Sequence, residues 1–338
     1  MARDVKTPNP HFTALDRTTS PAAATSVAVA VSNRRPKPSP GMEPKTPPYE
    51  SRSKSQNSTP PPSSAAARLW RPAAQRNLRN QWSTFKSLRQ DWRSAASTAR
   101  SHATTIVNSY LSQKYMDGME FGVLSDMPNI RKKACFKLFK QQELYRGKLL
   151  SSYRDMVAIV IRMVNTCKSM RCYLRGTGNS PLAQFSFSVE DDSDSGDCGG
   201  IPVFTFYSVA SFEELAWEMV RMFISELNLK RLLVMEMLSI YDEKVAEVTG
   251  ICWSDEFYDG EFDDLSIFNL YSEETREPVL PCLRSCKSSI SAVLSKQQQD
   301  SNVLQVYLTT WLAEVNIDRC RVDEIFATVG GEMHVDFS

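Results

Sequence analysis

The chain has 338 residues, 42% of them hydrophobic, and a formal net charge of +1. This length allows about two domains, and the composition excludes a chain too poor in apolar residues to form a packed core. The near-neutral total hides an asymmetry: residues 1–175 carry 30 Lys and Arg against 10 Asp and Glu, whereas residues 176–338 carry 10 against 29. A basic half of this kind favours contact with nucleic acid, an anionic membrane or an acidic cytoskeletal polymer. The alternative is that the two halves attract each other within one fold.

The cysteines and the N-terminus indicate the compartment. Eight cysteines lie scattered without the spacing of a disulfide framework, and no secretory segment follows Met1. We therefore expect reduced thiols in a cytoplasmic or nuclear protein, and no stretch predicts a transmembrane helix. A plastid transit peptide stays an alternative because the first hundred residues are rich in Ser, Ala and Arg, although Asp4, Asp16 and the many prolines argue against it.

Residues 1–67 hold twelve of the eighteen prolines and few large apolar side chains, so we expect a disordered basic tail. Hydroxyl–proline pairs recur in it, at Thr7, Ser20, Ser39, Thr46 and Thr59. Proline-directed kinases act on such pairs in extended chain, and each phosphate would add about −1.5 to −2 charges. The tail is therefore expected to be phosphoregulated by a kinase of this class.

Residues 68–176 have the pattern of a long, basic helical hairpin. In the first half Leu78, Phe85 and Trp92 are spaced by seven, which places them on one stripe of a helix that starts near Pro72. A second helix, with apolar residues spaced by threes and fours, runs from Pro128 towards Gly176. The loop at 115–127 is short, which makes the helices antiparallel neighbours.

The apolar stripes of the two helices are expected to form a closed seam, either within one chain or between two copies as a homo-oligomer. The seam residues are Leu78, Trp82, Phe85, Trp92, Ile106, Tyr110, Leu138, Tyr145, Leu149, Met156, Val160 and Met163. The tryptophans are interpreted as core and are expected to meet Met163 and Met170, near the C-terminal end of the second helix.

Basic residues of the tail and the hairpin are the candidates for contacting a polyanion. They are Arg34, Arg35, Lys37, Arg68, Arg71, Arg76, Arg79, Arg131, Lys132 and Lys133. The run NRRPKPSP at 33–40 also resembles a nuclear import signal or a polyproline ligand, and both are weak matches.

The acidic half begins with two alternating runs, at 184–189 and 201–209, around a Gly/Asp-rich loop. They predict a β-hairpin within 177–210. A third helix is expected over 211–250, because Ser211 and Glu214 fit a capping box. Its apolar residues cover more than one face, which indicates burial against two neighbours.

Residues 251–300 hold a segment that mixes carboxylates with aromatic rings, WSDEFYDGEFDDLSIFNLYSEE, followed by a linker. Such a segment either folds back on the basic second helix, between Arg131 and Arg154, or docks into an external partner. Residues 301–338 predict two further helices, the last ended by Gly330 and Gly331. The expected fold is mainly α: a long antiparallel, coiled-coil-like helical bundle with a small β-hairpin insertion and a disordered N-terminal tail.

Residues suited to catalysis are scarce. The chain has three histidines and shows no zincin pair, phosphate-binding glycine loop or nucleophile elbow. Cys167 and Cys172 are spaced wrongly for one helical face, which argues against a zinc site with Cys282 and Cys286. We therefore predict no enzyme activity, no cofactor, no metal and no small-molecule substrate.

The sequence favours a non-catalytic, phosphoregulated helical adaptor of the spindle, chromosome or cytoskeleton, with a role in the cell cycle. Its basic half is expected to contact microtubules or another polyanion, beside protein partners, in the nucleus or cytoplasm. Two alternatives stay open: a nuclear nucleic-acid-binding regulator, and a peripheral membrane or trafficking tether that uses the basic helix.

Overall fold

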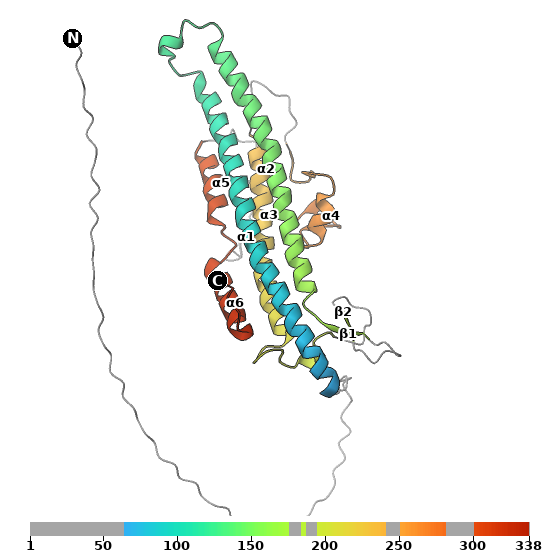
Figure 1. The fold of residues 1–338 in the computed structure, drawn as a ribbon. Helices are drawn as coiled ribbons and strands as arrows, with labels where there is room; N and C mark the ends of the chain where they lie inside the picture. The colour runs from blue at the N-terminus through green and yellow to red at the C-terminus, as the bar shows by residue number, and fades with distance from the viewer. Residues whose placement is uncertain (1–63, 176–183, 187–194, 241–250, 282–300, 338) are drawn as a thin grey trace, which may run out of the picture. The chain divides into compact units, whose positions relative to one another are not determined.

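The computed structural model describes residues 64–175, 184–186, 195–240, 251–281 and 301–337. These residues form six α-helices and two small antiparallel strand pairs, which confirms the mainly helical fold (Figure 1). The five Ser/Thr-Pro pairs and the candidates Arg34, Arg35 and Lys37 lie outside the described residues.

The two longest helices form the predicted hairpin. Helix α1 (Ser64–Met116) and helix α2 (Ile130–Lys168) run antiparallel and are joined through a short 3₁₀ turn, η1 (Gly122–Leu124) (Figure 1). Helix α1 starts before Pro72, so the expected start at the proline is wrong. Proline has no N–H, so the Arg68 carbonyl has no helical hydrogen-bond partner. Pro72 and Arg68 both lie on the exposed side of the helix, where water can bind that carbonyl.

Helix α2 ends at Lys168, eight residues before the expected Gly176. Side chains of α1 donate hydrogen bonds to the carbonyls at this end. The Asn77 amide donates to the carbonyls of Ser169 (2.8 Å) and Met170 (3.0 Å). The Trp70 indole donates to the Cys172 carbonyl at 2.7 Å. These donors satisfy carbonyls that a continuing helix would otherwise have bonded, so the chain can leave the helix at Lys168.

Helix α3 (Val209–Leu238) lies behind the hairpin and packs against both of its helices (Figure 1). It starts earlier than the capping box predicted, because the Ser208 side chain accepts from the Ser211 amide and is the N-cap. Its buried residues lie on several faces, as the sequence indicated. Helices α5 (Ser301–Ala313) and α6 (Arg319–Met333) cover the α1 side of this layer (Figure 1).

The seam is closed within one chain. Of its twelve predicted residues, ten are buried, and Leu138 and Tyr145 are half-buried. Of these two, Tyr145 packs against His102 of α1, with 5.5 Å between the ring centres.

The tryptophans share a buried core cluster with Met163 and Met170 and also pack against aromatic rings outside α2. The Trp82 ring packs edge-on against Phe326 of α6, and Trp92 packs edge-on against Phe223 of α3. Arg89 of α1 lies over the Phe326 ring at 5.4 Å. The tryptophans are therefore core residues, and the stripe that bears them also faces the C-terminal helices.

A small antiparallel strand pair is present, but with a different partner strand from the predicted one. Strand β2 (Gln184–Ser186) pairs with β1 (Tyr173–Arg175), which follows α2, and residues 201–208 form no strand. Three successive amides of that run, from Thr205 to Tyr207, donate instead to one carboxylate oxygen of Glu332, at 2.5–2.9 Å. Donors bound by a side chain are not available to a strand partner, which explains the difference.

The C-terminal helix continues through the two glycines that were expected to end it. Helix α6 ends at Met333, and His334 adopts the left-handed conformation with φ 55° as its cap. The chain then turns back so closely that a Cβ on Gly330 would lie 2.6 Å from the Val335 carbonyl oxygen. Gly330 is therefore required for this close approach rather than for ending the helix.

Candidate functional site

The exposed basic surface of the hairpin is the main candidate site. Residues 64–175 hold 21 Lys and Arg against six Asp and Glu. The seven polyanion candidates that the structure describes are all exposed: Arg68, Arg71, Arg76, Arg79, Arg131, Lys132 and Lys133. We call the first four the α1 cluster and the last three the α2 cluster.

The fold separates the two clusters. The α2 cluster follows the hairpin turn, where Gln113 of α1 donates to the Cys135 carbonyl of α2 at 2.9 Å. From Arg79 to Gln113 the helix rises about 50 Å, at 1.5 Å per residue. The structure therefore places basic residues towards both ends of an elongated surface and does not gather them at one point.

Some of these cations are also used within the chain. The Arg71 guanidinium donates to the Pro202 carbonyl at 2.8 Å, and Arg79 lies over the Phe204 ring at 4.9 Å. In the α2 cluster, Arg131 lies over the Phe121 ring at 4.6 Å. Stacked guanidinium groups keep their charge and a solvent-facing edge, so they stay able to bind an anion.

The acidic-aromatic segment folds back on the chain itself. It carries the short helix α4 (Glu261–Ser266) and the strand pair β3 (Tyr271–Ser272) and β4 (Glu277–Pro278). Arg154 of α2 lies over the Tyr258 ring at 5.2 Å, but the central cation is Arg231 of α3, not one of the predicted α2 residues. Of the two alternatives that the sequence left open, residues 251–281 fold back on the chain itself, and α3 is their main support.

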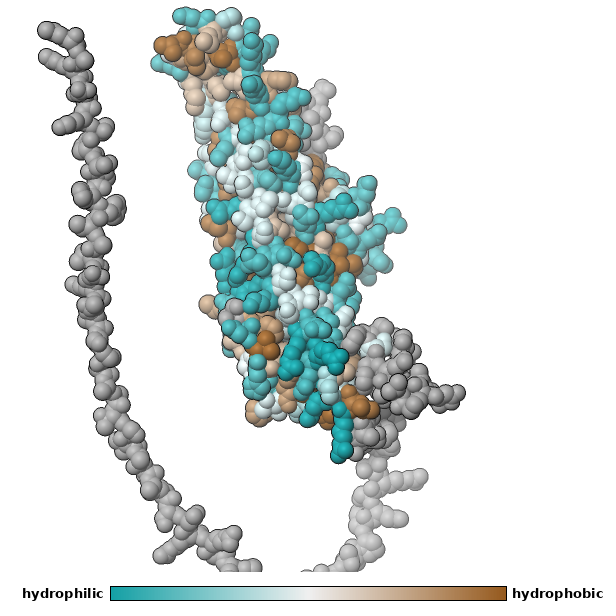
Figure 2. Space-filling view, viewed as in Figure 1, coloured by the Kyte–Doolittle hydropathy of each residue, from teal (hydrophilic) through white to brown (hydrophobic). Residues whose placement is uncertain are grey.

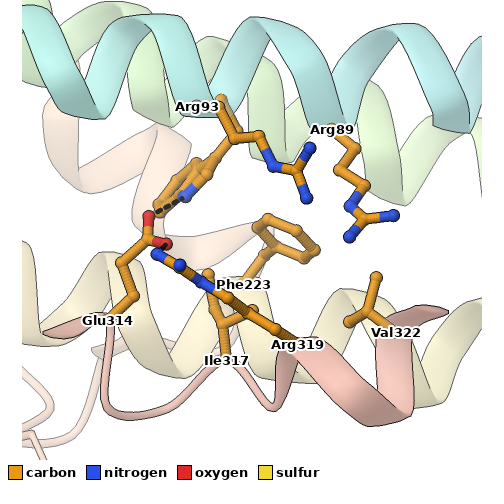
Figure 3. A pocket seen from close by; sticks show the side chains of 8 residues that line it. Arg89, Arg93, Phe223, Glu314, Ile317, Arg319 and Val322 are labelled. Carbon is orange, nitrogen blue, oxygen red and sulfur yellow. Dashed lines mark hydrogen bonds and ion pairs between the residues drawn. The ribbon is translucent and has the colours of Figure 1, made fainter. Parts of the chain in front are cut away.

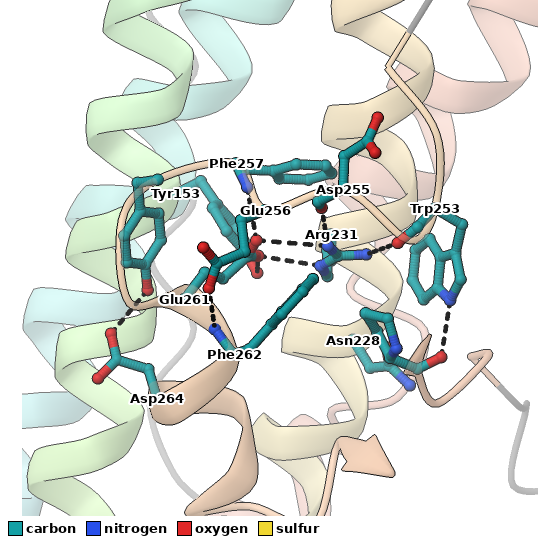
Figure 4. A network of polar contacts seen from close by, with 12 residues as sticks. Tyr153, Asn228, Arg231, Trp253, Asp255, Glu256, Phe257, Glu261, Phe262 and Asp264 are labelled. Atoms are coloured by element: carbon teal, nitrogen blue, oxygen red, sulfur yellow. Dashed lines mark hydrogen bonds and ion pairs between the residues drawn. The ribbon is translucent and has the colours of Figure 1, made fainter. Parts of the chain in front are cut away.

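Arg231 and Glu261 form a buried clamp that holds this segment (Figure 4). One oxygen of Glu261 accepts from Arg231 Nε at 2.9 Å and from the Tyr153 hydroxyl at 2.7 Å. Arg231 also donates to the Trp253 carbonyl at 2.9 Å and lies 4.3 Å from the Phe257 ring centre. Burial, together with the Glu261 carboxylate, holds the pKa of Tyr153 well above its usual range. With its donors and acceptors directed at one another, the cluster is suited to holding the fold.

A second buried ion pair joins α3 to the C-terminal helices. Lys230 Nζ lies 2.8 Å from Glu226 and donates to the Trp311 carbonyl at 2.6 Å. The other oxygen of Glu226 accepts from the backbone N–H of Asn316 at 3.0 Å. Burial lowers the pKa of Lys230, and Glu226 opposes that change. A signal for both pairs was present in the sequence: Lys230 and Arg231 stand between Leu229 and the apolar run 232–235.

The described residues form one very small cavity and one larger, open groove. A cavity of about 10 Å³, the space of about one water molecule, lies between α1, α3 and residues 314–322 (Figure 3). Glu314 lines it, accepting from the Trp92 indole at 3.0 Å and from Arg319 at 2.9 Å. A second, open groove of about 480 Å³ is lined by α3, by Val164 of α2 and by residues 267–269, and it carries mainly apolar side chains.

Candidate metal ligands and nucleophiles are not gathered. In the part of the chain that the structure describes, no three His, Cys, Asp or Glu side chains are placed to hold a metal ion. Burial raises the pKa of the Cys167 thiol, which keeps it protonated and unreactive. Cys282 and Cys286 lie outside the described residues. Among the helices described, none combines the length and apolar character needed to cross a bilayer.

Glu332 allows a pH-dependent test of how α6 is held. Burial opposes its ionisation, but three backbone donors, with His334 nearby, lower the pKa of Glu332 below the usual 4.5. A lowered pKa stabilises the fold above pH 4.5, and this contribution is lost as the pH falls further. We expect Glu332→Gln to reduce the free energy of unfolding by about 1–2 kcal/mol at pH 7. In urea titrations the difference in free energy of unfolding between the variant and wild type should shrink below pH 4.5. A difference that stays constant with pH would contradict the role given to the Glu332 charge.

No protein-family model matches this sequence, and a search of curated proteins finds no significant match. The functional interpretation therefore depends on the surface and the packing described above.

Proposed function

We propose that the protein is a non-catalytic helical adaptor whose basic hairpin binds an extended polyanion, with microtubules as the leading candidate. The single observation behind the proposal is the charge of α1 and α2 and its exposure: seven candidate cations face solvent, towards both ends of the hairpin. Cations spread over about 50 Å suit a long polymer surface better than a compact ligand.

The acidic half has a supporting role in this proposal. Residues 251–281 are held internally by Arg231, α5 by the bond from Lys230 to the Trp311 carbonyl, and α6 by the pair of Arg321 with Glu218. The clamps use carboxylates of the acidic half, Glu226 and Glu261, against cations of the same half. The α1 and α2 clusters are thereby left to act on an external partner.

The test is co-sedimentation of the full chain with microtubules at increasing salt. Binding through several cations should weaken steeply with ionic strength, because each contact releases condensed counterions. Reversing Arg131, Lys132 and Lys133 to Glu is expected to weaken binding by about tenfold and to flatten the salt dependence. The matched control is Arg100→Glu, an exposed reversal midway along α1, which should change binding about twofold or less. Binding that ignores salt would contradict the proposal.

The nucleic-acid alternative uses the same cations and is separated by a second measurement. Gel-shift titrations with unrelated duplexes should show at most weak, sequence-independent binding if the surface only recognises a line of negative charge. Tight binding to one sequence, lost in the α2-cluster variant, would favour a nuclear regulator instead.

Phosphorylation at Thr7, Ser20, Ser39, Thr46 and Thr59 is proposed as the means of control. Negative charge added to the basic tail would lower its attraction to the same polyanion. The residues lie outside the described part of the chain, so the proposal depends on their sequence context alone.

A further inference from the structure

The end of the hairpin exposes a cluster of apolar side chains. The α1–α2 connection and its flanking turns carry Tyr115, Met119, Val123, Leu124, Met127 and Phe136, all exposed. Val123 is 91% exposed and Phe136 is 61% exposed. Figure 2 shows brown, apolar residues gathered at this end of the molecule. We call these six residues the apolar tip.

The tip is an ordered part of the fold. Successive turns close it, with the amides of Leu124, Ser125 and Met127 donating to carbonyls three residues earlier, at 2.9–3.1 Å. The hairpin projects beyond α3, α5 and α6 at this end (Figure 1). The tip is therefore a protruding apolar surface on a rigid support, and apolar side chains grouped in this way mark an interaction site.

Basic residues surround the tip. Between residues 110 and 140 the chain holds six Lys and Arg against three Asp and Glu. The six cations are all exposed: Lys114, Arg131, Lys132, Lys133, Lys137 and Lys140. The first turn of α2 contains no acidic residue, and Arg131, Lys132 and Lys133 lie at this positive end of the helix. Such a concentration of positive charge is unfavourable for the isolated chain and favourable when an anionic surface meets it.

We propose that the apolar tip inserts into the surface of an anionic membrane, with the surrounding Lys and Arg contacting lipid headgroups. An anionic bilayer offers an apolar phase and negative charge at the same place, and a protruding tip can enter it. Nucleic acid satisfies the cations but offers no apolar phase for Val123, Leu124 and Met127. The long stems of the lysines can lie along the acyl boundary while their ammonium groups reach the headgroups. This contact shares Arg131, Lys132 and Lys133 with the polymer binding proposed above and adds the apolar tip, which polymer binding does not use.

The experiment is flotation of the full chain with phosphatidylcholine vesicles, with and without phosphatidylserine. Wild type should float with the anionic vesicles and not with the neutral ones. Val123→Asp is expected to lower the partition onto anionic vesicles by about tenfold or more, since it removes an inserting group and adds a like charge. The matched control is Val306→Asp, the same change at a residue of α5 that is 59% exposed, which should float as wild type does.

Three results would overturn the inference. They are wild type that stays unbound on anionic vesicles, Val123→Asp that floats as well as Val306→Asp, and Val123→Asp that turns an oligomer into a monomer in sedimentation velocity. The last outcome would make the tip a contact between copies of this chain. Val123→Ser serves as the second variant if the aspartate fails to fold. Microtubule co-sedimentation of Val123→Asp should be unchanged, so failure here and failure of the adaptor proposal are separable.

Discussion

Replacing Arg231 with Ala is expected to lower the free energy of unfolding by about 3–5 kcal/mol, because the buried Glu261 carboxylate loses its cation. Arg231 and Glu261 are both fully buried, and the guanidinium also donates to the carbonyls of Trp253 and Asp255. Without it, the Glu261 carboxylate stays buried with no cation, and the buried Trp253 carbonyl loses its donor. The acidic-aromatic segment should then detach, so residues 251–281 should become the first site of limited proteolysis.

Urea unfolding followed by circular dichroism measures this loss. The control is Arg321→Ala on α6, which removes a bidentate pair with Glu218 at 2.7 and 2.8 Å. Those side chains are more than a third exposed, so water screens the pair and only a small part of the Arg231 effect is expected. The double variant Arg231→Met with Glu261→Leu should recover much of the lost stability. Equal losses for Arg231 and Arg321 would contradict the clamp.

Trp311→Ala is expected to cost about 3–5 kcal/mol, the range for removing a large aromatic side chain from a core. Trp311 is buried where α5 meets α1 and α3, and its indole donates to the Ala96 carbonyl at 3.0 Å. Lys230 lies over its ring at 4.7 Å, so truncation also removes the aromatic face from a buried ammonium group.

Thermal and urea unfolding measure the loss of stability in Trp311→Ala, and a substitution at the neighbouring residue is the control. Leu312→Ala changes the next residue of α5, which is 51% exposed. It is expected to stay within about 0.5 kcal/mol of wild type. A loss at Leu312 as large as that at Trp311 would mean that the outer face of α5 is covered in solution.

Both predictions concern how the acidic half is attached to the basic hairpin. If the clamp at Arg231 and the contact at Trp311 hold as the geometry indicates, the C-terminal helices stay on the hairpin while α1 and α2 keep their exposed cations. Polyanion binding by the hairpin should then survive in clamp variants that still fold. This separates residues that maintain the fold from those proposed to bind.

The helical hairpin could be predicted from the amino-acid pattern. Leu78, Phe85 and Trp92 recur at helical spacing, and an apolar stripe must be buried wherever it finds a partner. For the same reason ten of the twelve predicted seam residues are buried. The exposed basic residues could also be predicted, because charges on the polar face of a helix stay in water.

Local pattern could not reveal interactions between residues far apart in the chain. Asn77 meets the end of α2 some 92 residues later, and Glu332 binds amides 125–127 residues earlier, which converts an expected strand into a loop. Nothing in the local pattern around Arg231 identifies Glu261, 30 residues later, as its partner. A buried polar group needs a partner, and which partner it receives depends on how the helices pack, because hydrogen bonds and ion pairs act only at contact distance.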